Sequence, residues 1–265
     1  MRRTLLVAAV ASLVTGSLTQ AGARIPRPPV PFDVEADCSA APPAAHSVSG
    51  VTDDGRVVAV EVAVLLDGVK KSRARQLMAK AAGAYAGVGI DLVAVSFDKL
   101  PLTAPPGERP SIDAADAIRQ AKAFFGGERP PGSDLVHLLT TKDLTLPNYG
   151  AATAGAAECA GGVQWPDKAF SVTEDSGLDA YSLDAPGLTN VMDSSAGTVA
   201  HELGHLLGGL HQYASCAEGA DAADVTNRDP SPCTIMSDVV DVASLRFGTV
   251  ESAVVRGYAL RFADS

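Results

Sequence analysis

The sequence predicts an α/β domain with a largely parallel sheet and helices packed on it. The first observation is that short apolar runs, rich in valine and leucine, alternate with longer segments of helical periodicity. The order strand, helix, strand, helix, strand implies right-handed crossovers between parallel neighbours. The second observation is a later helix whose apolar stripe is suited to a buried core. We predict strands at residues 57–66, 90–97 and 135–141, and helices at 70–86 and 112–125.

The first strand and helix illustrate the pattern. Residues 57–66 are almost all valine, leucine or alanine, so we expect a strand buried on both faces. In residues 70–86, basic side chains lie on one side and apolar side chains on another, which indicates an amphipathic helix ending near Gly87. A proline-rich loop follows the second strand, and Gly126 and Gly127 end the second helix.

Three segments with a weaker secondary-structure signal complete the predicted fold. Residues 149–157 are small and glycine-rich, which suits a short edge strand approached by another backbone, and 170–173 can add one more strand. Residues 249–262 are expected to form a closing helix. His137 lies inside the strand at 135–141, where a histidine is expected to be packed in the core and not to bind a metal.

The later helix is expected to begin near Asp193 or Ser194, because either side chain can cap it. It carries His201 and His205, which lie one above the other on one face because they are four residues apart. Two neutral imidazoles at that spacing can hold one metal ion. Alone, this spacing also fits a surface helix with two solvated histidines.

The residues around these histidines favour a metal site. Gly208 can adopt the positive φ that ends a helix, and the resulting turn would bring His211 back as a third ligand. Glu202 follows the first ligand, where it can reach a water molecule held by the metal. Three protein ligands and one open position are typical of a catalytic zinc site. The sequence therefore predicts Zn²⁺ bound by His201, His205 and His211, with Glu202 catalytic.

Net charge and the N-terminus bear on partners and location. The net charge of −10, without a basic stripe, argues against nucleic-acid binding. Residues 1–23 are interpreted as a secretory signal, because two arginines precede a short apolar run and an Ala-Gly-Ala cleavage site. An uncleaved membrane anchor is the alternative. The mature protein is then expected to be secreted, extracellular and monomeric, without a membrane partner.

After the signal, residues 24–49 are rich in proline and alanine, and are expected to form an extended arm or a short pro-segment. Residues 50–265 form the predicted catalytic domain. The polar, acidic segment 217–232 could hold Ca²⁺, but it lacks the spacing of a calcium loop, so a solvated loop is the stronger interpretation.

The four cysteines are disulfide candidates in a secreted protein. We favour Cys216 with Cys233, because both flank one loop beside the histidines, and this leaves Cys38 with Cys159. Closing the first loop would stabilise the fold by about 3 kcal/mol. In an alternative interpretation, the Cys38 thiolate caps the zinc in a latent precursor.

The extended histidine motif, followed by Cys233-Thr234-Ile235-Met236-Ser237, resembles the metzincin zinc endopeptidases, and most closely their adamalysin or reprolysin branch. The resemblance implies a zincin fold with a mixed twisted sheet. The active-site helix would lie between an N-terminal lobe, about 50–208, and a small C-terminal lobe, about 209–265. It also implies that Met236 is a hydrophobic floor beneath the zinc.

The resemblance further implies where substrate binds. Residues 150–157 would correspond to the edge strand that pairs with an extended polypeptide substrate. Val239, Val240 and Val242 would line the pocket beside the scissile bond. The chain departs from the family at Gln212, where the adamalysin-like branch usually has aspartate, and at Asp238, where astacin-like members carry tyrosine.

The sequence thus predicts a secreted zinc-dependent endopeptidase that hydrolyses peptide bonds with a zinc-activated water and Glu202 as general base. The alternative is a secreted, non-catalytic zinc-binding or adhesive module on the same scaffold. Such relatives usually lose the glutamate, whereas this chain retains Glu202.

Overall fold

The computed structural model describes residues 53–105, 110–146, 152–176, 194–211, 234–236 and 245–263. The predicted signal (1–23), the arm (24–49) and the acidic loop (217–232) lie outside the described residues, as do Cys38, Cys216, Cys233, Gln212 and the three pocket valines. The described strands are β1 (Val58–Asp67), β2 (Ile90–Lys99), β3 (Ser111–Asp113), β4 (Leu135–Thr140), β5 (Asp143–Thr145), β6 (Ala152–Thr153), β7 (Gly155–Ala157) and β8 (Phe170–Glu174). The described helices are α1 (Lys71–Ala86), α2 (Ala114–Phe124), the short 3-10 helix η2 (Gly162–Gln164), α3 (Ser194–Leu206) and α4 (Thr249–Phe262).

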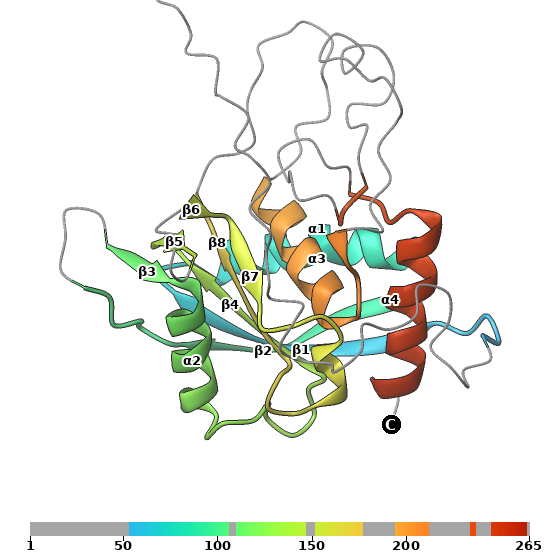
Figure 1. The fold of residues 1–265 in the computed structure, drawn as a ribbon, viewed down its shortest axis with the longest axis horizontal. Helices are drawn as coiled ribbons and strands as arrows, with labels where there is room; N and C mark the ends of the chain where they lie inside the picture. Colours follow the sequence, from blue (N-terminus) through green and yellow to red (C-terminus); the bar gives the residue numbers. More distant parts are fainter. Residues whose placement is uncertain are drawn as a thin grey trace, which may run out of the picture. The chain divides into compact units, whose positions relative to one another are not determined.

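A five-stranded mixed sheet is the centre of the fold, in the order β2-β1-β4-β8-β7 (Figure 1). The first four strands are parallel, and β7 pairs antiparallel with β8 at one end of the sheet. The predicted α/β class with a mixed sheet is therefore confirmed. The edge strand expected within 149–157 is also confirmed, as β7.

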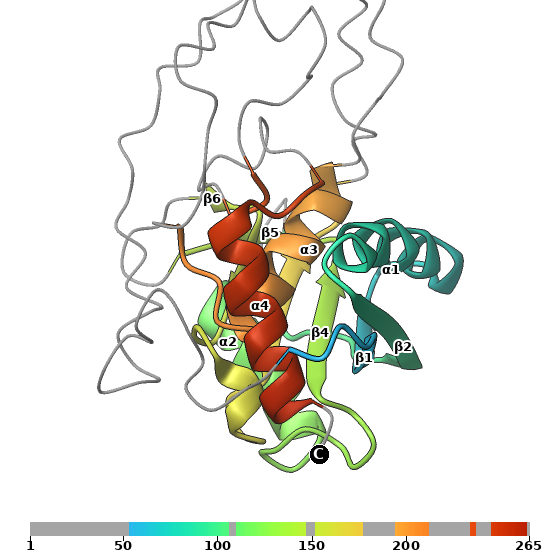
Figure 2. The ribbon, with the colours of Figure 1, turned by 90° about the vertical axis from the view of Figure 1, so that its right-hand side faces the viewer.

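Helices cover the sheet on both sides. Helices α1, α3 and α4 share one core with alternate residues of β1, such as Val60, Val62 and Val64. Helix α2 packs on the opposite face, against Ala63 and Leu65 of the same strand. Figures 1 and 2 show α2 on the other side of the sheet from α1 and α3. The period-two alternation of side chains along a strand produces this division.

Two predicted details are wrong. The first strand is not buried on both faces throughout, because Ala59 and Glu61 are exposed and the core under α2 begins only at Ala63. The second helix begins at Ala114 and not at residue 112, because residues 111–113 pair with β5 in a small second sheet, β3-β5-β6. The Asp113 side chain caps this helix by accepting the Ala115 N–H at 2.9 Å.

His137 is packed in the core, as expected. Its side chain is fully buried, and its Nδ1 lies 2.8 Å from the hydroxyl of Ser171 on the neighbouring strand. Within the part of the chain that is described, no helix has both the length and the apolar character needed to cross a bilayer.

Candidate metal centre

Helix α3 carries His201, Glu202 and His205 into the core of the domain. All of its residues from Ser195 to Leu206 are buried, because it packs against the sheet and helix α1 and shares one core with α4. The Tyr85 hydroxyl on α1 donates a hydrogen bond of 2.8 Å to the Ala200 carbonyl of α3, just before the first histidine. The histidines are therefore attached to a rigid element fixed from two sides.

A Schellman turn ends this helix and brings His211 back to the other two histidines. The Gly209 N–H donates to the Gly204 carbonyl at 2.8 Å, and the Gly208 N–H donates to the His205 carbonyl at 2.8 Å. Gly208 has φ of +84°, which confirms the predicted positive φ. A Cβ at Gly208 would also lie 2.5 Å from the Tyr258 ring of α4, so this position excludes side chains for two reasons.

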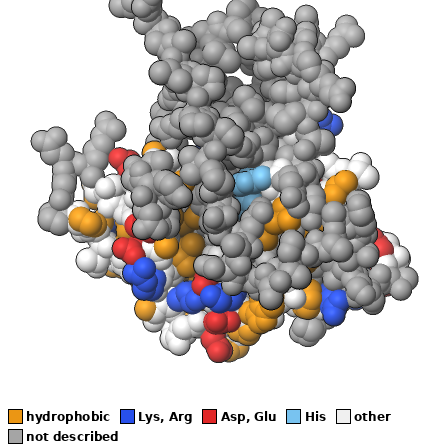
Figure 3. All heavy atoms as spheres, viewed as in Figure 1, with side chains coloured by type: hydrophobic (Ala, Val, Ile, Leu, Met, Phe, Trp, Pro, Cys, Tyr) orange, Lys and Arg blue, Asp and Glu red, His pale blue; other side chains and the backbone are white. Residues whose placement is uncertain are grey.

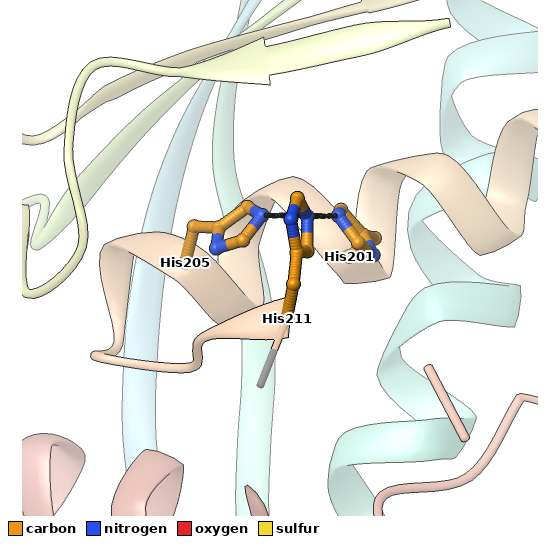
Figure 4. Close-up of side chains that lie close together, drawn as sticks. All are labelled: His201, His205 and His211. Carbon is orange, nitrogen blue, oxygen red and sulfur yellow. Dashed lines mark hydrogen bonds between the residues drawn. The ribbon is translucent and has the colours of Figure 1, made fainter. Parts of the chain in front are cut away.

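The three imidazoles meet at their Nε2 atoms (Figure 4). The distances are 3.0 Å between His201 and His205, and 3.1 Å from each of these to His211. Among the described residues, this is the one group of three or more potential ligand side chains close enough to share a metal ion. The structure thus brings together the three histidines predicted from the sequence.

Backbone carbonyls fix the orientation of two rings. His201 Nδ1 lies 2.7 Å from the Ile235 carbonyl, and His205 Nδ1 lies 2.8 Å from the Gly209 carbonyl. A carbonyl oxygen only accepts hydrogen bonds, so each Nδ1 must carry its proton and donate it. Each Nε2 then presents its lone pair to the other rings. Such hydrogen bonds from the ring nitrogen that faces away from the metal are typical of histidines that bind a metal.

The electrostatics also keep these imidazoles neutral. Burial and, to a lesser extent, the nearby His211 lower the pKa of His201 to about 3. Burial likewise lowers the pKa of His205 well below its usual value. Neutral imidazole is the form that binds metal ions.

These residues fit a zinc ion. Ligand atoms about 2.0–2.1 Å from one tetrahedral zinc lie roughly 3.3 Å from each other, close to the 3.0–3.1 Å observed. Without a cation between them, three such lone pairs would repel one another. His201 and His205 are only 3% and 7% exposed, yet histidine atoms are visible at the surface in the space-filling view (Figure 3). The centre is therefore buried but open to one side.

Glu202 is 5% exposed, and burial raises its pKa well above the usual value. Strand β7 comes very close to its side chain: a Cβ at Gly155 would lie 2.8 Å from both Cγ and Oε1 of Glu202. The sequence pattern suggested that another backbone approaches this glycine-rich segment. The backbone of β8 pairs with Gly155, and the side chains of Glu202 and Thr198 occupy the space that a Cβ would take there.

Met236 lies beneath α3 and is fully buried. Its Sδ would be 2.6 Å from a Cβ at Gly204 and 3.0 Å from one at Gly209, so both glycines allow the sulfur to pack closely against the backbone of the helix and of the turn that follows it.

Sequence reasoning did not identify the Ile235 carbonyl or the contact of Gly155 with Glu202. Gly155 was visible in the sequence only as one glycine among several.

The remaining candidate site residue in the described part is Cys159, which is fully buried and disulfide-bonded. The other three cysteines lie outside the described residues, so the predicted pairings remain predictions. The same holds for the calcium hypothesis.

Comparisons with known proteins agree with this geometry. The family model described as metallo-peptidase family M12B, reprolysin-like, matches residues 72–212, more than half of the chain. No curated protein matches the chain.

The crystal structure of an archaemetzincin from Methanopyrus kandleri has a TM-score of 0.51 at 16% identity, covering 78% of this chain and 98% of that one. A zinc-dependent peptidase from Methanocorpusculum labreanum has a TM-score of 0.47 at 17% identity, covering 73% and 99%. At this identity, the archaemetzincin match shows a shared zincin-like fold.

Proposed function

We propose that this chain, which belongs to the reprolysin-like metallo-peptidase family M12B, is a secreted zinc endopeptidase of the adamalysin branch. Membership of that family makes the chain a metallopeptidase, a hydrolase that acts on polypeptides. The observation that carries the proposal is the set of three Nε2 atoms within 3.0–3.1 Å of one another, two of them fixed by Nδ1–H contacts to carbonyls.

We assign the zinc ligands to His201, His205 and His211 and the general base to Glu202. When bound, zinc supplies a Lewis acid that polarises the scissile carbonyl and lowers the pKa of water. The buried Glu202 carboxylate accepts a proton from the attacking water, and its raised pKa makes it a stronger base. As the C–N bond breaks, Glu202 returns this proton to the leaving amine, so the carboxylate is regenerated. Met236 packs beneath the helix that carries two of the ligands.

Strand β7 is the proposed binding edge for an extended peptide. It is the terminal strand of the sheet, and its first residue, Gly155, lies directly against Glu202. A peptide strand added beside β7 would gain main-chain hydrogen bonds and would run next to the general base. Binding in extended form therefore places a peptide bond close to the reacting groups.

Secretion is supported by the N-terminal sequence, where Arg2 and Arg3 precede an apolar run and the Ala21-Gly22-Ala23 cleavage site. The disulfide at Cys159 fits an oxidising compartment. N-terminal sequencing of the protein recovered from culture medium checks this point. A chain that starts after residue 23 is expected, and a chain that remains membrane-bound with its first residues intact would contradict secretion.

The activity is tested by digestion of casein with the purified protein. We expect cleavage that a chelator abolishes and that added Zn²⁺ restores. The matched control is Glu202→Gln, which keeps the size of the side chain and is expected to bind zinc normally but to lose cleavage. Normal zinc content without any cleavage of casein or gelatin by the native protein would instead favour a non-catalytic binding module.

A further inference from the structure

Glu251 is a buried carboxylate that the proposed reaction does not use. It lies in the first turn of α4, far from α3 in the sequence, and its side chain is fully buried. A buried carboxylate is costly unless hydrogen-bond donors satisfy its oxygens. Its partners therefore show what the residue stabilises.

Three donors converge on this carboxylate. The Thr234 hydroxyl donates to Oε1 at 2.5 Å, and the Gly248 N–H donates to Oε2 at 2.7 Å. The backbone N–H of Met236 is the third donor. Two of the three donors thus belong to residues 234–236, which we call the Met-turn segment.

The Met-turn segment in turn holds the first histidine. The Ile235 carbonyl accepts the Nδ1–H of His201 at 2.7 Å, while the Ile235 N–H donates to the Arg246 carbonyl at 2.9 Å. Ile235 lies between the two residues that Glu251 fixes, Thr234 and Met236. The direction of its carbonyl is therefore set by contacts on both sides, and that carbonyl fixes the ring and the tautomer of His201.

We propose that Glu251 is a positioning residue of the zinc centre: it fixes the Met-turn segment so that the Ile235 carbonyl holds His201 with its Nε2 toward the shared metal position. This inference rests on the proposed function, because it requires His201 to be a zinc ligand. It assigns Glu251 no contact with substrate. Loss of its hydrogen bonds should first appear as weaker zinc binding.

The test compares Glu251→Gln with the native protein by zinc competition against a chromophoric chelator. Gln has the same size, but its amide group is neutral and cannot accept all three hydrogen bonds. We expect zinc affinity to fall by about 10- to 100-fold, as for other groups that orient metal-binding histidines. Unchanged affinity in a folded Glu251→Gln protein would overturn the proposal. A native protein that binds no zinc would instead overturn the proposed function.

Asp67→Asn is the matched control for general destabilisation. Asp67 is also a buried carboxylate, and it accepts hydrogen bonds from the Leu102 N–H, the Thr140 hydroxyl and Lys142, all outside the histidine centre. Its substitution is expected to lower the melting temperature without changing zinc affinity. Equal weakening of zinc binding in both variants would show that Glu251 acts only through overall stability, against the proposal.

A milder pair keeps the proposal testable even if Glu251→Gln does not fold. Thr234→Val removes one donor to Glu251 with little change in shape, whereas Thr234→Ser retains the hydroxyl. We expect Val to weaken zinc binding several-fold and Ser to restore most of the native affinity. Equal zinc affinity in the Val and Ser variants would contradict the proposal.

Discussion

Two buried glutamates beside the histidine centre differ in their hydrogen-bond surroundings. Burial is the cause that raises the pKa of Glu202, whereas at Glu251 burial raises the pKa and hydrogen bonds from Thr234, Gly248 and Met236 oppose it. Hydrogen-bond donors lower the basicity of a carboxylate. A carboxylate that accepts several hydrogen bonds also fixes the segments that supply the donors. We propose that the same residue type serves the reaction at Glu202 and the geometry of the site at Glu251.

The same substitution at Glu202 and at Glu251 is expected to have different consequences. Glu202→Gln is expected to reduce kcat/KM for peptide cleavage by about 10²- to 10⁴-fold, because the proton acceptor is lost. Its unfolding free energy should stay equal or rise, since a buried charge is replaced by a neutral amide. Glu251→Gln should instead cost about 1–3 kcal/mol of unfolding free energy, because buried donors lose their acceptor.

Urea denaturation, zinc content and cleavage kinetics measured on both variants give this contrast. If Glu251→Gln retained full zinc occupancy and full stability but lost cleavage, Glu251 would take part in the reaction itself, and the proposed division of roles would be wrong.

A second, smaller effect is expected at Gly155, which contacts one of the two glutamates. In Gly155→Ala, the new Cβ would lie 2.8 Å from the Glu202 Oε1 and 2.7 Å from Thr198 Cγ2, so the carboxylate must move. We expect kcat/KM to fall by about 10- to 100-fold, since small displacements of catalytic groups are costly. Zinc affinity should change little.

Gly83→Ala is the control for this substitution. Gly83 lies within α1, and a Cβ added there would meet no atom within 4 Å. Alanine at this position should therefore stabilise the helix by about 0.5–1 kcal/mol and leave cleavage unchanged. Native activity in Gly155→Ala would mean that Glu202 tolerates displacement by strand β7.

The sequence alone was informative wherever the signal is local. The i, i+4 spacing of His201 and His205 and the positive φ at Gly208 depend on the helix and its end, and both are observed. The carbonyl of Ile235 and the carboxylate of Glu251 were not predicted, because their hydrogen bonds join segments 34 and 17 residues apart. Such contacts depend on how helices and turns pack in three dimensions.

The fold shows the same division. The long helical segments α1 and α4 were predicted to within one residue at each end. The three-residue strands β3 and β5 are too short to show any period, and their pairing is a tertiary contact. The sequence therefore predicted the residues at the metal centre better than the groups that orient them.

The smallest expected effect concerns His137, a buried histidine that does not belong to the metal centre. Burial lowers its pKa to about 3, compared with about 6.5 in an unfolded chain. The unfolded state therefore binds a proton more readily between these values. The stabilisation from keeping this side chain neutral is complete above pH 6.5 and is lost as the pH falls toward 3.

His137→Leu removes this titration. Urea denaturation at a series of pH values should show a shallower loss of unfolding free energy below pH 6.5 than in the native protein, by at most about 1.4 kcal/mol per pH unit. Ser171→Ala removes the hydrogen-bond partner but keeps the buried imidazole, so it should retain the native slope. The histidines of the metal centre contribute equally to the pH dependence of all three proteins, so they do not affect the comparison. If His137→Leu showed the same pH slope of unfolding free energy as the native protein, His137 would be protonated in the folded state without unfolding of the core.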